Sequence, residues 1–331
     1  MRAKRNQLGR HLARGGRRLF EKWPWLPRVV TGTVVASAIV VAYSAFGLNW
    51  GRPDGDPWNY LAAGERLNAG HPLYALSPGD RSVITAPPYW TVPLLAPPPI
   101  AVAWRPLALL GDLSMWVWGL AGAIATVAAM VFLARRGALA SLAVLALPVA
   151  LTALSGNASA ILLPMLIAAY VFRDRPWIVG TLIALAAAVK LTPLALVLWL
   201  IATGRHRAVI VCGVVLLGVA LVSAMGAGPE AFAAWLEAVA DAAPSPRSMA
   251  SLTGLPTVVV AAVLALPVVV LCGRDRASFA AAVVATSLAT PAFYFPALAL
   301  LVALPFWRDA RGDGARRRRG DSDPGDQAIA P

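Results

Sequence analysis

Runs of about twenty apolar residues limit what this chain can fold into more than any other feature of its sequence. A helix needs about twenty such residues to cross the roughly 30 Å hydrocarbon core of a bilayer. The first run is Val29–Leu48, and others lie at about 114–134, 138–154, 157–172, 208–226 and 251–272. Only 14% of the residues are charged, too few to cover a soluble domain of this size. The sequence therefore predicts an all-α polytopic membrane protein, with the first run retained as an anchor.

The net charge of +13 is concentrated at the two ends of the chain. Nine Lys/Arg residues lie within residues 1–28 and six within residues 308–319. Basic tails beside apolar spans are typical of segments that face the cytoplasm and its anionic lipids. We therefore expect a cytoplasmic tail over 1–28, one integral-membrane domain over 29–306 and a disordered cytoplasmic tail over 307–331. RNA binding by the tails is the alternative, and we expect no nucleic-acid partner.

Two apolar stretches, 176–203 and 277–306, are long for one span and short for two. Short basic loops separate the runs and should all face the cytoplasm: Arg135-Arg136, Arg173/Arg175, Arg205/Arg207 and Arg274/Arg276. All four loops can share a side only if 176–203 folds back on itself, and the same logic makes 277–306 a hairpin. The prediction is about ten transmembrane or re-entrant segments in the inner (plasma) membrane, with both termini cytoplasmic.

Lys190 lies at the apex of the predicted 176–203 hairpin. Each arm has about 14 residues, roughly 21 Å of helix, so the apex is expected below the headgroups, facing a cavity lined by protein. An ionisable residue at that depth is a functional candidate, and short apolar segments interrupted by proline indicate binding sites. The alternative is a lysine whose ammonium reaches the interface.

The first external loop, residues 49–113, is predicted to lie outside the cytoplasm and to carry an amphipathic helix over 57–69. Asp56 is expected as the N-cap of this helix, with Pro57 at its first position and Gly70 as its stop. A capping carboxylate at the mouth of a cavity is also a fixed carboxylate, so both roles stay open for Asp56. Asp54 is explained by its Pro-Asp-Gly turn.

Proline-rich and amphipathic segments complete the external parts. Residues 87–99 contain six prolines, which favours a re-entrant or interfacial element over 85–110 rather than a span; a hydrophobic lid without a ligand is the alternative. Residues 227–250 include "PEAFAAWLEAVADA", which predicts another surface helix. The two cysteines, Cys212 and Cys272, sit in apolar runs, so neither a disulfide framework nor a metal site is expected.

Three stretches of the chain carry recognisable motifs. "DPWNYLAAGERLNAGHPLY" (56–74) contains D-x-x-x-Y-x-x-A and L-x-x-G-x-P-L-Y, "APPPIAVAWRPLALL" (96–110) contains a Pro-Pro element, and 156–200 contains a Gly-Asn stretch followed by A-x-x-x-K-x-x-P. In their order and spacing these motifs resemble those of glycosyltransferase family 87, the polyprenol-phosphate-mannose-dependent mannosyltransferases with a GT-C-type fold. Asn157 stands where the family usually has Gln.

The resemblance implies transfer of a hexose, with mannose as the favoured sugar, from a polyprenyl-phosphate donor to an envelope glycolipid or glycan. The configuration at the anomeric carbon would be inverted. Asp56 matches the family's catalytic aspartate and would act as general base. Because the leaving group is a phosphate monoester, fixed cations should suffice, and no metal or other cofactor is expected. Lys190 is the first candidate for binding the donor phosphate, and Arg81 and Arg105 are the second. The candidates for acceptor or sugar binding are Tyr60, Trp58, Asn157, Tyr89 and Trp90. The alternative role is core packing for Tyr60 and interfacial anchoring for Trp58, Tyr89 and Trp90.

Two other functions remain open on the sequence. A transporter or flippase would have an inverted repeat and charged pairs through several spans, and the chain has one plausibly buried charge, Lys190, and no evident repeat. A non-catalytic membrane partner in envelope glycan assembly is the second alternative.

Overall fold

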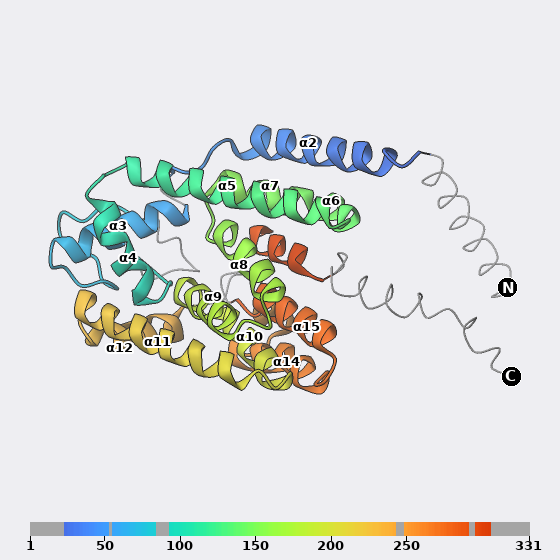
Figure 1. The fold of residues 1–331 in the computed structure, drawn as a ribbon. Helices are drawn as coiled ribbons and strands as arrows, with labels where there is room; N and C mark the ends of the chain where they lie inside the picture. Colours follow the sequence, from blue (N-terminus) through green and yellow to red (C-terminus); the bar gives the residue numbers. More distant parts are fainter. Residues whose placement is uncertain (1–22, 53–54, 84–92, 243–247, 291–294, 306–331) are drawn as a thin grey trace, which may run out of the picture.

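The computed structural model describes residues 23–52, 55–83, 93–242, 248–290 and 295–305, and these residues form helices without any strand (Figure 1). The all-α prediction is therefore confirmed for this part of the chain. The elements, in chain order, are α2 (Leu26–Phe46), α3 (Asp56–Asn68), α4 (Pro98–Ala108), α5 (Leu113–Arg135), α6 (Leu139–Val144), α7 (Ala146–Ser155), α8 (Ser159–Val171), α9 (Pro176–Val189), the 3-10 helix η1 (Thr192–Leu194), α10 (Ala195–Ala202), α11 (His206–Ala227), α12 (Glu230–Asp241), α13 (Met249–Thr253), α14 (Thr257–Val270), α15 (Asp275–Leu288) and the 3-10 helix η2 (Phe295–Ala303).

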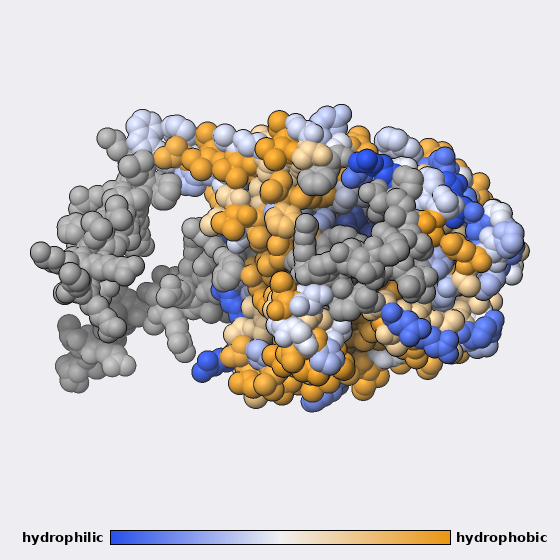
Figure 2. Space-filling model, turned by 180° about the vertical axis from the view of Figure 1, so that it is seen from behind, coloured by the Kyte–Doolittle hydropathy of each residue, from blue (hydrophilic) through white to orange (hydrophobic). Residues whose placement is uncertain are grey.

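Three helices among the described residues, α2, α5 and α11, are long and apolar enough to cross a bilayer. Their outward side chains, such as Val40, Leu120 and Leu217, are exposed to the surroundings of the molecule. Figure 2 shows hydrophobic residues over the middle of the molecule and hydrophilic ones gathered at the end that carries α3, α4 and α12. The apolar helices thus indicate a membrane protein with a polar end.

The segment predicted as one span at 138–154 consists of two helices, α6 and α7, separated by one residue. The break follows from Pro148, whose ring clashes with the carbonyl four residues earlier and which lacks an N–H. That carbonyl belongs to Val144, where α6 ends. Leu145, with φ −103° and ψ 15°, joins the two helices.

Residues 176–203 fold back on themselves, as the basic loops predicted. Helix α9 ends at Val189, because its C-cap residue Lys190, with φ −151° and ψ 131°, leaves the helical region. Helix α10 then returns the chain, so that Arg205 Nη2 lies 3.6 Å from Asp174 Oδ1 at the start of α9. The 277–306 segment also returns, because the Arg276 guanidinium donates a hydrogen bond to the Pro305 carbonyl.

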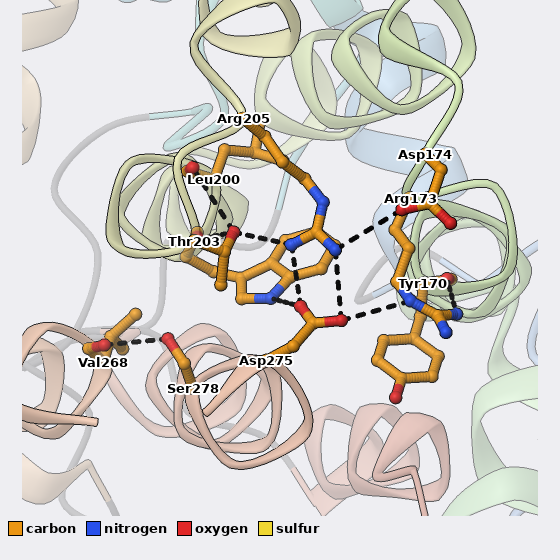
Figure 3. Close-up of polar contacts among 10 residues, drawn as sticks. Tyr170, Arg173, Asp174, Leu200, Thr203, Arg205, Val268, Asp275 and Ser278 are labelled. Carbon is orange, nitrogen blue, oxygen red and sulfur yellow. Dashed lines mark hydrogen bonds and ion pairs between the residues drawn. The ribbon is translucent and has the colours of Figure 1, made fainter. Parts of the chain in front are cut away.

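An ionic cluster fastens the ends of these two hairpins together (Figure 3). Asp275 accepts two hydrogen bonds from Arg205, at 2.7 and 3.1 Å, and one from Trp199 Nε1 at 2.9 Å. Arg173 Nε lies 3.1 Å from the same carboxylate. We call these four residues, with Asp174, the Asp275 cluster. It brings three of the four predicted cytoplasmic loops to one place.

Helix α3 is held by close packing on α4 and α5. A Cβ on Gly64 would lie 2.8 Å from the Trp104 carbonyl oxygen, so only glycine allows the two helices to approach this far. Tyr60 packs against both Trp104 and Trp118, with ring centroids 5.8 and 5.7 Å apart. This aromatic contact fixes the rotation of α3 and therefore the direction in which its polar residues point.

Candidate active site

Asp56 is the first residue of α3, and Gly55 is the N-cap, so the predicted capping role of Asp56 is wrong. Its carboxylate instead accepts a hydrogen bond of 3.1 Å from the backbone N–H of Ala158, at the start of α8. Residue 158 is 102 positions away in sequence. Asp56 therefore joins α3 to the start of α8, and its carboxylate is held at the N-terminal end of α8, where partial positive charge favours an anion.

The turn between α7 and α8 is the surface on which the start of α3 rests. Gly156 has φ +65°, and a Cβ there would lie 2.8 Å from Pro57 Cγ. The turn also accepts a 2.8 Å hydrogen bond from Trp118 Nε1 at the Gly156 carbonyl, and Trp50 Nε1 donates to the Ala153 carbonyl at 2.9 Å. A glycine is needed at 156 for both the backbone conformation and the close approach.

Lys190 and Asp56 are close enough for their charges to interact. In the described part of the chain the Lys190 ammonium makes neither a hydrogen bond nor a direct ion pair. Lys190 is half-buried, at the end of α9, where the chain turns back. The structure thus brings the two principal predicted site residues together and leaves the hydrogen-bonding capacity of the ammonium for a ligand.

Burial shapes the ionisation of Asp56 and Tyr60. Burial raises the pKa of the Asp56 carboxyl above its ordinary value, against the opposing effects of the Ala158 N–H, the Lys190 charge and the Tyr60 hydroxyl. Burial and the neighbouring Asp56 carboxylate raise the pKa of Tyr60 well above its usual range, so Tyr60 stays a hydrogen-bond donor to Asp56. A carboxylate with a raised pKa is a better proton acceptor than one in water.

Three buried polar atoms next to these residues in the chain have no hydrogen-bond partner in the described structure: Asn59 Oδ1, Ser159 Oγ and Thr192 Oγ1. Buried polar groups in folded proteins are nearly always paired. In the sequence, Asn59 comes three residues after Asp56, Ser159 directly follows Ala158, and Thr192 comes two residues after Lys190. These three residues could not be recognised from the sequence, because Asn, Ser and Thr are common in helices and turns without any functional role.

Asn157 lies in the α7–α8 turn, and its side chain makes a hydrogen bond within that turn. Its Oδ1 accepts a 2.9 Å hydrogen bond from the Ser159 N–H at the start of α8, and its side chain stays half-buried. Asn157 is thus one residue away from the N–H that Asp56 contacts.

The predicted arginines and Trp58 lie in other surroundings. Arg81 forms a bidentate ion pair with Glu65, with N–O distances of 2.7 and 2.8 Å, and a second ion pair with Asp112 at 2.9 Å. Its guanidinium also lies 4.6 Å from the Trp58 ring. Arg105 donates to Asn68 and, at 2.8 Å, to the Gly226 carbonyl. The structure does not bring these arginines to Asp56 within the contacts of the described residues.

The remaining predicted site residues, Tyr89 and Trp90, and Asp54 lie outside the described residues. Among the residues that are described, no three His, Cys, Asp or Glu side chains form a group able to hold a metal ion.

Comparison with known protein families identifies the family of this chain. The model of glycosyltransferase family 87 matches residues 95–319, about two thirds of the chain. No curated protein and no solved structure matches the chain. The matched range includes Lys190 and the α7–α8 turn but begins after α3, so Asp56 lies outside it.

Proposed function

The chain belongs to glycosyltransferase family 87. We propose that it transfers a hexose, with mannose as the favoured sugar, from a polyprenyl-phosphate donor to an envelope glycolipid or glycan. Membership in the family supports glycosyltransferase activity, and hence a sugar donor and an acceptor. The observation that carries the finer proposal is the pair formed by Asp56, half-buried and held by Ala158, and the unpaired Lys190 ammonium across from it.

In the proposed reaction Asp56 is the general base. Its carboxylate takes the proton of the acceptor hydroxyl while that oxygen attacks C1 of the hexose and the C1–O bond to phosphate breaks, with inversion at C1. The Tyr60 hydroxyl and the Ala158 N–H hold the carboxylate in place during this step. The raised pKa of Asp56, caused by burial, supports proton acceptance by this group.

Lys190 is proposed to bind the phosphate of the donor and to neutralise the charge that develops as polyprenyl phosphate leaves. A preorganised cation at a site with little water is effective for this purpose. Because the leaving group is a monoester, the proposal needs no metal ion. Arg81 and Arg105 remain second candidates, although the two carboxylates on Arg81 and the carbonyl and amide on Arg105 already use much of their bonding capacity.

The orientation that we propose is a multi-pass protein of the inner membrane, with both termini in the cytoplasm and Asp56 on the outer side. The gathering of Arg173, Arg205 and Arg276 near Asp275 supports a common cytoplasmic face for these loops. Lys190 lies at the other end of α9, roughly 21 Å of helix away. This separation suits a donor that is used on the outer side.

The test is transfer from radiolabelled polyprenyl-phosphate-mannose in membranes that contain the full chain. Asp56→Asn should lower the rate about 10²- to 10⁴-fold, the usual contribution of a general base, with unchanged expression and thermal unfolding. Asp241→Asn, at an exposed position on α12, is the matched control and should transfer at the wild-type rate. Equal rates for Asp56→Asn and wild type would exclude Asp56 as the base, and absence of transfer by every variant would favour a non-catalytic partner.

A further inference from the structure

The Trp50 side chain lies against two helices, although Trp50 itself lies outside every helix. It comes after the end of α2 and six residues before Asp56. Its indole Nε1 donates a 2.9 Å hydrogen bond to the Ala153 carbonyl on α7. A Cβ added to Gly119 of α5 would lie 2.1 Å from Trp50 Cδ2 and 2.4 Å from Cγ. The indole therefore lies directly on the α5 backbone, at a place that only glycine leaves open.

The contact with α7 satisfies backbone groups that the end of a helix leaves open. The last four carbonyls of an α-helix have no N–H partner within that helix, and α7 ends at Ser155. Two of these carbonyls, those of Ala153 and Leu154, accept hydrogen bonds from Trp50 Nε1 at 2.9 Å and from the Asn49 N–H at 3.0 Å. The chain just before α3 therefore caps the end of α7.

On the chain side, this cap is only a few residues away from Asp56. The Arg52 N–H donates to the Asn49 carbonyl at 3.2 Å, and the Gly55 N–H donates to the Arg52 carbonyl at 3.1 Å. Asp56 follows Gly55 as the first residue of α3. Because five residues separate Trp50 from Asp56 and these hydrogen bonds shorten the path further, a displacement of Trp50 is transmitted to the start of α3.

On the partner side, Trp50 contacts the turn that supplies the hydrogen-bond donor to Asp56. A Cβ on Gly156 would lie 2.8 Å from Pro57 Cγ and 3.2 Å from Trp50 Cδ1, so both side chains lie against this glycine. Ala158, two residues later, donates its N–H to the Asp56 carboxylate at 3.1 Å. Trp50 is thus in contact with the turn that carries the donor and is joined by a short segment to the acceptor.

We propose that Trp50 is a positioning residue for Asp56 and acts through the α7–α8 turn. The indole occupies the space between Gly119 and this turn, and so sets the place from which the Ala158 N–H reaches the carboxylate. The inference rests on the proposed function, because it takes Asp56 to be the general base. It adds to that function a side chain that acts through other residues and takes no part in the chemical step itself.

The experiment is transfer from polyprenyl-phosphate-mannose by the full chain in membranes, with kcat and the donor KM measured for each variant. Trp50→Ala should lower kcat about ten- to a hundred-fold at an unchanged donor KM, because small displacements of a catalytic group are that costly. Gly119→Ala should give a similar loss, since its Cβ would strike the indole, and it covers the case in which Trp50→Ala does not fold. Gly218→Ala, in α11, is the matched control, because its Cβ would meet no atom of the described chain within 4 Å.

Three further variants separate positioning from a general loss of structure. Trp50→Phe keeps a ring over Gly119 and loses the hydrogen bond to Ala153, so it should recover most of the kcat that Trp50→Ala loses. Adding Gly119→Ala to Trp50→Ala should cause no further loss, since the indole that the Cβ would strike is gone. Adding Trp50→Ala to Asp56→Asn should change the residual rate by no more than about two-fold, because the group that Trp50 positions is already absent.

A wild-type kcat for Trp50→Ala, or the same loss of rate from Trp50→Ala with and without Asp56, would overturn the proposal. Hydrogen exchange provides a measurement that does not depend on transfer. The amides of residues 157–160 should exchange faster in Trp50→Ala than in wild type and Gly218→Ala, because the turn has lost a contact.

The two measurements also distinguish this inference from the proposed function. Faster exchange in Trp50→Ala, together with wild-type transfer by Asp56→Asn, would refute only the role of Asp56 as the base. Loss of transfer in Asp56→Asn, together with unchanged kcat and unchanged exchange in Trp50→Ala, would refute only the positioning role of Trp50.

Discussion

A carboxylate and basic side chains lie near each end of α9, but the two groups differ in how many hydrogen bonds and ion pairs they make. At the start of α9 the Asp275 carboxylate is contacted by Arg205, Arg173 and Trp199 at 2.7 to 3.1 Å. At its end Asp56 has one backbone N–H at 3.1 Å and the Tyr60 hydroxyl, and Lys190 acts on it only through charge. Figure 3 shows how closely the first group is bonded.

The difference indicates which charges hold the fold and which are available for a substrate. A carboxylate that already has several donors gains little from a further ligand, and removing one donor leaves an uncompensated charge. A lysine without a partner can bind an anion without first breaking a contact. Charged residues among apolar helices are therefore not equivalent, and the number of their partners separates a structural cluster from a candidate site.

Replacing one basic residue in each group, Lys190 beside Asp56 and Arg205 in the Asp275 cluster, by methionine tests this comparison and should give the largest effect. Lys190→Met should lower kcat with the polyprenyl-phosphate donor about 10²- to 10³-fold, as expected when a donor to the developing charge is lost, with an unchanged Tm. Arg205→Met should leave the rate per folded molecule near wild type. It should lower the free energy of unfolding by about 2 kcal/mol, less than for a fully buried pair, because Asp275 keeps 34% of its side chain exposed.

Donor kinetics and thermal unfolding, measured on both proteins, check this pair of expectations. If Lys190→Met keeps the wild-type kcat and KM for the donor, Lys190 is structural. If Arg205→Met loses transfer while keeping its Tm, the Asp275 cluster takes part in function. The distinction between a structural cluster at Asp275 and a functional site at Asp56 and Lys190 would then be wrong.

Two glycines with the same backbone conformation give a second, smaller test. Gly156 and Gly254 have φ of +65° and +68°, but only Gly156 has a neighbour that a Cβ would strike. Alanine at either position should cost about 1 kcal/mol of stability, the usual penalty for a left-handed residue. Gly156→Ala should also push Pro57 away and lower the transfer rate about ten-fold, because small displacements of a catalytic group are costly.

Gly254→Ala is the control for strain alone, and the transfer rate of each variant is measured beside its Tm. Equal transfer rates for the two variants would mean that the contact between the α7–α8 turn and α3 does not position Asp56.

Much of the fold follows from the sequence because charge and length restrict it. The return of 176–203 was predicted from the basic loops at its two ends, and the contact of Arg205 with Asp174 confirms it. The break at Leu145 was missed, although Pro148 signalled it, because the run 138–154 has the length and hydropathy of a span. The predicted total of about ten segments is neither confirmed nor contradicted by three long helices and several shorter ones.

The candidate site was predictable only in part, for a physical reason. Asp56, Tyr60 and Lys190 were found from helix spacing, depth and the family resemblance, and the structure places them together. The hydrogen bond between the Asp56 carboxylate and the Ala158 N–H could not be predicted, because it joins segments 102 residues apart. It could not be predicted either that the buried guanidinium of Arg66, on α3, has no hydrogen-bond partner among the described residues, since composition reveals the type of a residue but not its number of hydrogen bonds.

The smallest expected effect concerns the hydroxyl of Tyr60. Burial raises the pKa of Asp56 above 3.8, and the Tyr60 hydrogen bond holds it down. Transfer needs ionised Asp56, so the rate should fall as pH decreases through a value above 3.8. Tyr60→Phe removes the hydrogen bond but keeps the ring between Trp104 and Trp118, and the acid limb should therefore move to higher pH with little change at the alkaline plateau.

The measurement is kcat against pH for Tyr60→Phe, with Tyr74→Phe as the matched control, since the Tyr74 hydroxyl bonds to the Ala96 carbonyl instead. The same sign applies to stability. Because the folded pKa is raised, the contribution of Asp56 to stability is complete below 3.8 and is lost as pH rises through the folded value. A shift of the acid limb to lower pH, or an equal shift in Tyr74→Phe, would show that Tyr60 does not act on Asp56 and would leave the Ala158 N–H as the hydrogen-bond donor to this carboxylate.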